Sequence, residues 1–143
     1  MPLLLEIVTP ERLAYSDTVD SVVLPGIDGE LGVLPHHAPL VSLLGVGELR
    51  IRKGAAEESF AIVGGFLQVR PDRVVVMAET ADLASEIDLE KAQQARLDAE
   101  RAIEGAAHTD APDLAAARAS LQQALLRIRV AERRHREGPR HRG

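Results

Sequence analysis

The stretch that most constrains the fold is residues 22–40, VVLPGIDGELGVLPHHAPL, in which turn-forming dipeptides separate short apolar runs. Pro25-Gly26 and Asp28-Gly29 are turn signals, because proline fixes φ and glycine accepts the positive φ that tight turns require. The apolar runs on either side are too short for helices. We therefore expect them to form β-strands joined by tight turns.

Two adjacent histidines, His36 and His37, lie in a corner between Pro35 and Pro39. Imidazole and carboxylate groups are common ligands of zinc and similar ions. Neighbouring side chains of an extended segment point to opposite faces, however, so these two rings would not converge on one ion. We expect no metal site, with one histidine packed in the loop and the other exposed.

Short apolar runs with turn signals between them continue to residue 78, at the spacing typical of an all-β sandwich or barrel. The expected strands are residues 3–8, 12–16, 21–24, 30–34, 40–44, 48–52, 59–63, 66–69 and 73–78. Nine such strands would form two facing sheets. Alternation in 48–52 predicts a half-exposed strand, and Gly64-Gly65 predicts a turn or bulge. The unbroken apolar run 73–78 predicts a strand covered on both faces, one of them by the helical element or by a partner.

The composition changes near residue 87, after which alanine dominates and predicts helices. Ser85 or Asp88 is the expected cap of a first helix that ends at Gly105, and Thr109 or Asp110 is the expected cap of a second. The expected apolar stripes are Leu89, Ala92, Arg96, Ala99 and Ile103, then Leu114, Ala117, Leu121, Leu125 and Ile128. The predicted fold is mainly β plus α: a flattened N-terminal β-sandwich (residues 1–86) and a C-terminal antiparallel two-helix hairpin (residues 87–143).

Alanines along the seam bury little apolar area, so we expect this hairpin to close weakly and to adopt two conformations. Its charge also differs from that of the sandwich. Residues 1–86 carry 6 basic and 13 acidic side chains, a net charge of −7, whereas residues 127–143 carry 7 arginines and 2 glutamates, a net charge of +5. The basic end is either a solvated helix terminus or a surface for an acidic partner.

Several functional classes are disfavoured by composition. One tyrosine, two phenylalanines and a total charge of −5 leave no stacking platform and little overall attraction for nucleic acid. No cysteine, G-x-S-x-G or phosphate-binding glycine loop is present, so we expect no enzyme activity from this chain alone. We also expect no membrane span and no secretory signal.

The segment GELGVLPHHAPL, residues 29–40, resembles the signature of the epsilon subunit of F-type rotary ATP synthases. GELRI at 47–51, GGFLQV at 64–69 and VVVMA at 74–78 resemble later strands of that family in the same order. The resemblance implies a non-catalytic central-stalk subunit that couples rotation between the membrane ring and the catalytic head during proton-driven ATP synthesis. It also implies a peripheral location on the cytoplasmic face of a bacterial membrane, held there only through the complex.

The same resemblance implies partners and site residues. Glu30 and His37 match positions that face the gamma subunit and the rotor ring of c subunits, although Glu30 is equally an ordinary solvent-facing strand residue. The basic residues of the last helix would meet the catalytic alpha and beta subunits and inhibit ATP hydrolysis. In this sequence they are Arg127, Arg133, Arg134 and Arg136. A β-sandwich binding module without inhibition is the structural alternative.

Some bacterial members of this family bind regulatory ATP on the folded hairpin, and the matching residues here are Ile87, Asp88, Lys91 and Arg127. The match is incomplete, because Lys91 replaces an arginine and Gln123 replaces a second one. A lysine supplies charge without the bidentate fork of arginine. ATP sensing by a weak site therefore remains an alternative function, with Asp88 otherwise a helix cap and Arg127 otherwise a surface ion pair. No other cofactor is expected.

Overall fold

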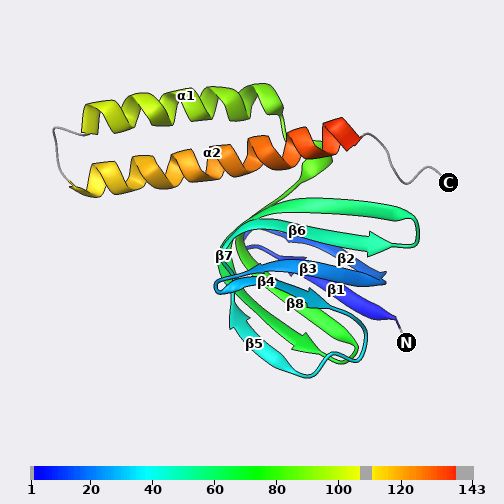
Figure 1. The fold of residues 1–143 in the computed structure, drawn as a ribbon. Helices are drawn as coiled ribbons and strands as arrows, with labels where there is room; N and C mark the ends of the chain where they lie inside the picture. Colours follow the sequence, from blue (N-terminus) through cyan, green and yellow to red (C-terminus); the bar gives the residue numbers. More distant parts are fainter. Residues whose placement is uncertain (1, 107–110, 138–143) are drawn as a thin grey trace.

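The computed structural model describes residues 2–106 and 111–137, and it has the predicted arrangement of a β-sandwich followed by two antiparallel helices (Figure 1). Turns divide the sandwich into eight strands within residues 2–106. These are β1 (Leu3–Val8), β2 (Leu13–Val19), β3 (Ser21–Gly26), β4 (Gly29–Val33), β5 (Leu40–Leu43), β6 (Val46–Lys53), β7 (Ala56–Arg70) and β8 (Arg73–Leu83).

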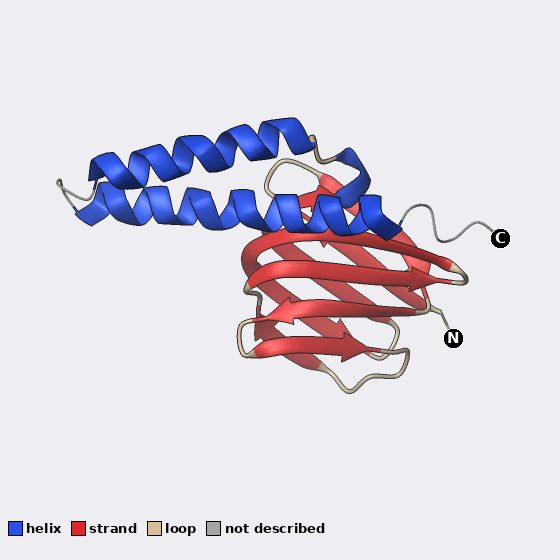
Figure 2. Ribbon diagram, turned by 45° about the horizontal axis from the view of Figure 1, so that its top comes forward, coloured by secondary structure: helices blue, strands red, loops and turns tan. Residues whose placement is uncertain are grey.

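The strands follow the order β2-β1-β8-β7-β6-β3-β4, and β5 pairs with the second half of β7. Only β1 and β8 run parallel; the other pairs in this described region are antiparallel. The turn after β3 also bonds to the end of β5, since Ile27 N–H donates to Leu43 O (3.1 Å) and Gly45 N–H donates to Pro25 O (2.7 Å). These bonds join the end of β5 to the β3–β4 hairpin, and Figure 2 shows the strands curving around the sandwich.

The prediction of nine strands was wrong because β7 joins two of them, residues 59–63 and 66–69, into one long strand. Gly64-Gly65 lies inside it without changing the register with β8, since Val63↔Thr80 and Gly65↔Ala78 keep the same offset, so the pair is neither the turn nor the bulge predicted. Both glycines have positive φ, 60° and 101°. The pair therefore bends the strand between the two layers without ending it.

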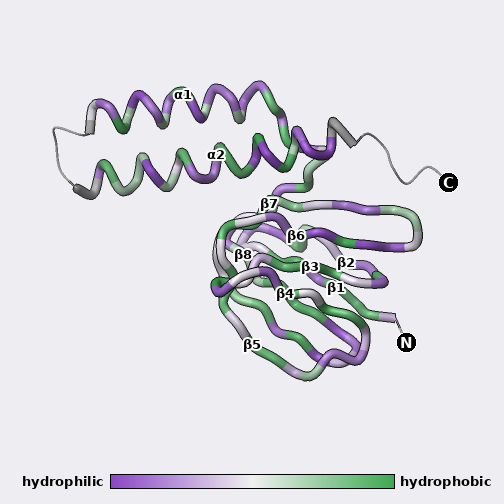
Figure 3. The backbone as a smooth tube through the Cα atoms, viewed as in Figure 1, coloured by the Kyte–Doolittle hydropathy of each residue, from purple (hydrophilic) through white to green (hydrophobic). Residues whose placement is uncertain are grey.

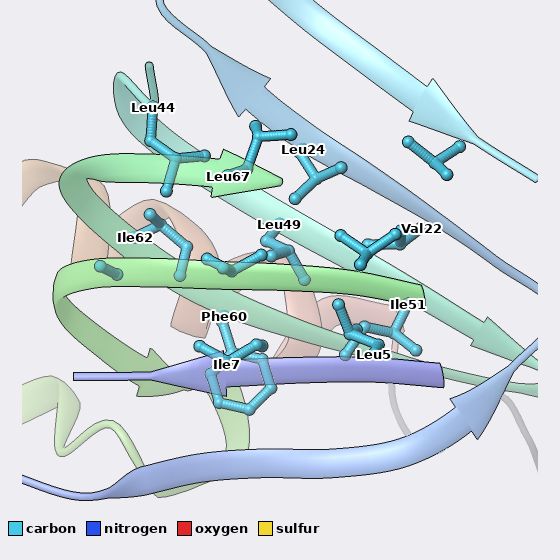
Figure 4. Packing of buried hydrophobic residues seen from close by; sticks show 14 of the residues in the cluster. Leu5, Ile7, Val22, Leu24, Leu44, Leu49, Ile51, Phe60, Ile62 and Leu67 are labelled. Carbon is cyan, nitrogen blue, oxygen red and sulfur yellow. The ribbon is translucent and has the colours of Figure 1, made fainter. Parts of the chain in front are cut away.

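Aliphatic side chains from both layers form the core of the sandwich (Figure 4). Phe60 lies among them, and its ring meets the Tyr15 ring edge-on with 5.8 Å between centroids. The alternation predicted for β6 is confirmed, with Leu49 and Ile51 buried and the polar residues outward. The fully covered strand predicted at 73–78 was wrong: Val75 and Met77 are half-buried, since the helices contact β6 and β7 rather than this part of β8.

A short 3-10 turn, η1 (Ala84–Glu86), leads from the sandwich to α1 (Leu89–Ala106) and α2 (Ala111–Glu137). Asp88 caps α1 as predicted, with its Oδ1 accepting a hydrogen bond from Lys91 N–H at 3.1 Å. The alternative caps proposed for the second helix, Thr109 and Asp110, lie outside the described residues.

The helices are more polar than the strands (Figure 3), and only α2 rests on the sandwich. One predicted position of its apolar stripe was wrong: Leu125 is 44% exposed, whereas Leu126 and Val130 are buried. The reason is that α2 packs on two sides. Ala117, Ala124 and Ile128 are buried as a hairpin seam requires, and Leu126 and Val130 belong to a second face that contacts the sheet.

Candidate functional site

The C-terminal half of α2 lies across β6, β7 and η1, and this junction carries most of the predicted site residues (Figure 2). Its apolar part is small. Leu126 and Val130 pack against three residues of the sandwich side, Ala61, Val63 and Ala84. Ile87 adds a partly buried side chain at the edge.

An ion pair lies beside this apolar cluster. Arg127 Nε donates to Asp82 Oδ2 at 2.9 Å, and the two side chains are 31% and 38% exposed. Solvent screens a pair of this exposure, so it adds little to the stability of the junction. Its main effect is to fix the direction of Arg127 toward the sandwich.

Arg133 forms the denser polar contact of the junction. Its guanidinium donates to Glu48 Oε2 and to Ser59 Oγ, both at 2.9 Å, and lies 3.5 Å from Glu57 Oε1. Ser59 is 5% exposed, so Arg133 supplies a hydrogen bond to a buried hydroxyl. The contact therefore satisfies groups that would otherwise be costly to bury.

The predicted inhibitory arginines make different contacts where the structure describes their side chains. Arg127 and Arg133 bind carboxylates of their own chain, and Arg134 is half-buried beside a small cavity that also touches Glu58 and Ser85. The side chain of Arg136 lies outside the described residues. In this conformation the cluster is partly engaged by the sandwich.

The four residues predicted for weak ATP binding, Ile87, Asp88, Lys91 and Arg127, line one pocket of about 450 Å³ between η1, α1 and α2. Sequence reasoning missed three further charged residues there. They are Arg12, Asp82 and Glu86. No local pattern could have found Arg12, which reaches the pocket only through the fold. The pocket therefore holds three cations and three carboxylates.

Glu30 lies on β4, and His37 lies in the loop after it. Glu30 is not a lone carboxylate: its Oε2 accepts a hydrogen bond from Arg50 at 3.0 Å, and its side chain is 61% exposed. His37 is half-buried with Nδ1 2.7 Å from Ala38 O. His36 is exposed and adopts φ 72°, with its N–H donating to Pro71 O.

One histidine is half-buried and the other exposed, as predicted, but the corner is a turn with His36 in the left-handed region rather than an extended segment. Within residues 2–106 and 111–137, no group of three or more His, Asp or Glu side chains is arranged to hold a metal ion.

An apolar surface that sequence reasoning missed lies around β5. Leu43 and Phe66 are paired across β5 and β7, and they are 56% and 44% exposed. Val41 lies two residues before Leu43 on the same strand face, and Ile27 bonds to Leu43 through the backbone. Contiguous exposed apolar side chains of this kind mark protein contact sites. The signal in the sequence was weak, because a strand with Val and Leu at alternate positions reads equally as core-facing.

Neither helix in the described part of the chain is long and apolar enough to cross a membrane.

Comparison with known proteins gives concordant matches. Residues 2–84 match the family model of the beta-sandwich domain of the ATP synthase delta/epsilon chain, and residues 85–132 match that of its long alpha-helix domain. An ATP synthase epsilon chain from Dehalococcoides mccartyi is 49% identical over 132 residues, which are 91% of this chain and 92% of that relative. One from Herpetosiphon aurantiacus is 46% identical over 138 residues, covering 96% of this chain and 100% of the relative.

Among solved structures, a chain in the cryo-EM structure of the Euglena gracilis mitochondrial ATP synthase, OSCP/F1/c-ring, superposes with a TM-score of 0.73. It is 23% identical, and the match covers 85% of this chain and 76% of that one. This likeness supports the fold.

Proposed function

The chain belongs to the epsilon-chain family of F-type ATP synthases, and from that premise we propose that it couples rotation in the central stalk and restrains ATP hydrolysis through its C-terminal hairpin. In this proposal it is a non-catalytic subunit. The observation that carries the restraint is the junction of α2 with the sandwich, where few apolar side chains and two partly buried ion pairs hold a long basic helix.

The sandwich is the part that we propose to stay bound to the rotor. The apolar surface of Ile27, Val41, Leu43 and Phe66 favours a protein partner, for which the gamma subunit is our candidate. The exposed Glu30 on β4 and the half-buried His37 in the loop after it are the candidate contacts with the rotor ring of c subunits. Association with the cytoplasmic face of a bacterial membrane would then be peripheral, through these subunits alone.

The hairpin is the part that we propose to move. While α2 lies on the sandwich, Arg127 and Arg133 bind Asp82 and Glu48, so they are engaged within the chain. When the hairpin leaves, these two arginines and Arg134 would become available to an acidic surface of the catalytic alpha and beta subunits, with Arg136 as the fourth residue of the predicted cluster. The docked form is therefore permissive and the undocked form is the brake.

The test is the ATPase activity of a catalytic complex depleted of its epsilon chain, measured after adding either the full chain or a truncated chain ending at Glu86. Binding of both to the complex is verified first. Inhibition by the full chain alone supports the brake. Equal activity with both bound chains would leave a structural coupler and overturn the brake.

A second candidate function, weak binding of regulatory ATP, is favoured by one observation: the four residues named for it from the sequence line the same pocket. Phosphate oxygens would take the Arg127 guanidinium from Asp82 and would meet Lys91. The carboxylates of Asp82, Glu86 and Asp88 oppose a triphosphate, so we expect affinity well below that of a site with two arginines.

Titration calorimetry of the full chain with ATP tests this second function. Binding that is lost in Arg127→Gln supports it, and Arg118→Gln, a change on the exposed surface of the same helix, is the matched control. Absence of heat at millimolar ATP, or equal loss in both variants, would overturn it.

A further inference from the structure

A row of alternating charges connects the exposed Glu30 to the C-terminal helix. Glu30 Oε2 lies 3.0 Å from Arg50 Nη1, and the same Nη1 lies 3.9 Å from Glu48 Oε1. The other oxygen of Glu48 lies 2.9 Å from Arg133 Nη2, which is also 3.5 Å from Glu57. The candidate rotor contact and the hairpin are thus the two ends of one polar network.

The strand pattern explains why these groups meet. Glu48 and Arg50 are two residues apart on β6, so both point to the outer face on which α2 rests. Arg50 pairs with Val23 of β3, and Val23 pairs with Gly32 of β4. Because Gly32 has no side chain, the Arg50 guanidinium can extend across β3 to Glu30 on the next strand.

Glu48 is the group for which two cations compete. Its side chain is only 13% exposed, so water solvates it poorly and it depends on arginine partners. Arg133 makes the short contact and Arg50 the long one, because Arg50 is drawn toward Glu30. Any change that releases Arg50 from Glu30 lets it move toward Glu48 and replace part of what Arg133 supplies.

We propose that Arg50 couples Glu30 to the docking of α2. A cationic side chain of a partner that binds Glu30 weakens the docking of α2. Undocking of α2 in turn draws Arg50 toward Glu48 and exposes Glu30 to that cation. Reciprocity follows from linkage, because each event must change the other by the same factor. The inference rests on the proposed function in one respect, that the hairpin leaves the sandwich.

The network makes predictions of opposite sign for neighbouring charges. Glu30→Gln imitates neutralisation by a cation and should raise the undocked fraction about two- to five-fold, the range of one exposed ion pair. Arg50→Gln removes the competitor and should lower that fraction by a similar factor. In the double variant Glu30→Gln has no effect, because the residue that transmits it is gone.

The absence of cysteine allows a direct measurement on the full chain. Val130→Cys places one thiol on the face of α2 that is fully buried against the sandwich, and the labelling rate of this thiol reports undocking. Val74→Cys, fully buried in the sandwich core, reports global unfolding in a parallel sample. Matched controls are Asp28→Asn and Lys53→Gln, which change the same charges outside the network.

The inference is upheld if the Val130→Cys thiol labels faster with Glu30→Gln, slower with Arg50→Gln, and unchanged by Glu30→Gln in the Arg50→Gln background. It is overturned if Asp28→Asn and Lys53→Gln give the same shifts, or if none of the variants shifts the rate. If the Val130→Cys and Val74→Cys thiols label at one common rate, the hairpin opens only with the whole fold, and the proposed brake fails together with the coupling.

Discussion

Replacing Leu126 with alanine should release the hairpin from the sandwich while the sandwich stays folded. Leu126 is 2% exposed, and with Val130 it provides the larger apolar side chains that α2 places on the sheet. Burial of each contributes about 1.5–3 kcal/mol, and the partly exposed arginine pairs add about 0–1 kcal/mol each. The cost of ordering the linker and side chains opposes this gain.

The net preference for docking is therefore a few kcal/mol, which leaves an undocked population of about 0.1–10%. Leu126→Ala removes about three buried carbon groups, or about 2–3 kcal/mol, because the loosened junction can collapse and leaves little cavity. A loss of this size raises the undocked to docked ratio roughly 30- to 150-fold. The undocked fraction would then rise to between about 3% and more than about 90%, depending on where in that range the native chain lies.

The assay is thiol labelling in a Val130→Cys background, with thermal unfolding of the same samples. Leu125→Ala is the matched control, since the neighbouring leucine is 44% exposed and is not a member of the buried cluster. We expect the large acceleration only for Leu126→Ala, with the unfolding temperature of the sandwich unchanged. Equal acceleration in both variants, or a fall in sandwich stability as large as the docking loss, would refute the reasoning.

Three further outcomes follow from individual contacts. Gly65→Ala should destabilise the sandwich by about 2–4 kcal/mol in urea unfolding, because its Cβ would lie 1.9 Å from a backbone carbonyl oxygen of β8 at a φ of 101°. The Cβ of Gly54→Ala meets open space, so that control should cost less. Burial, followed by two nearby carboxylates, raises the pKa of Tyr15 to about 12, so ultraviolet titration of this single tyrosine should show ionisation well above pH 10. The stability that this shift contributes is complete below pH 10 and is lost as pH rises toward 12. A titration midpoint near pH 10 would contradict this. Arg127→Gln breaks the exposed pair with Asp82 and should speed labelling under α2 by less than about five-fold, so an effect as large as that of Leu126→Ala would contradict our ranking of packing above charge.

Local chemistry was sufficient to predict the sandwich and the turn at Asp28-Gly29, where Gly29 has a φ of 130°. The turn predicted at Pro25-Gly26 was wrong, because both residues pair with β4 as the end of β3. The alternation of β6 depends only on having one buried face. Asp88 was recognisable as a cap because the bond that it accepts lies three residues away. Gly64-Gly65 was misleading, since glycines with positive φ are typical of turns and bulges, and only the unchanged pairing with β8 shows that the strand continues through a bend.

The junction could not be predicted because its contacts join distant parts of the chain. Arg133 meets Glu48 and Ser59 across 85 and 74 residues, and neither carboxylate nor hydroxyl carries a mark of that pairing in the sequence. The error at Leu125 has the same origin. A hairpin predicted in isolation has one buried seam, whereas α2 packs against both α1 and the sheet. The contact with the sheet is the one that buries Leu126.

Removing the charge of Arg133 and replacing Leu126 with alanine both release the hairpin, but only the second keeps all the arginines available to a partner. Arg133 cannot bind Glu48 and a carboxylate of a catalytic subunit simultaneously, so removing its charge weakens docking and the proposed brake together. High salt has the same double effect, since it screens both contacts. Leu126→Ala releases the helix and keeps every arginine, so it should increase inhibition of ATP hydrolysis by the reconstituted complex. A decrease would mean that the docked hairpin, rather than the released one, is the form that restrains the enzyme.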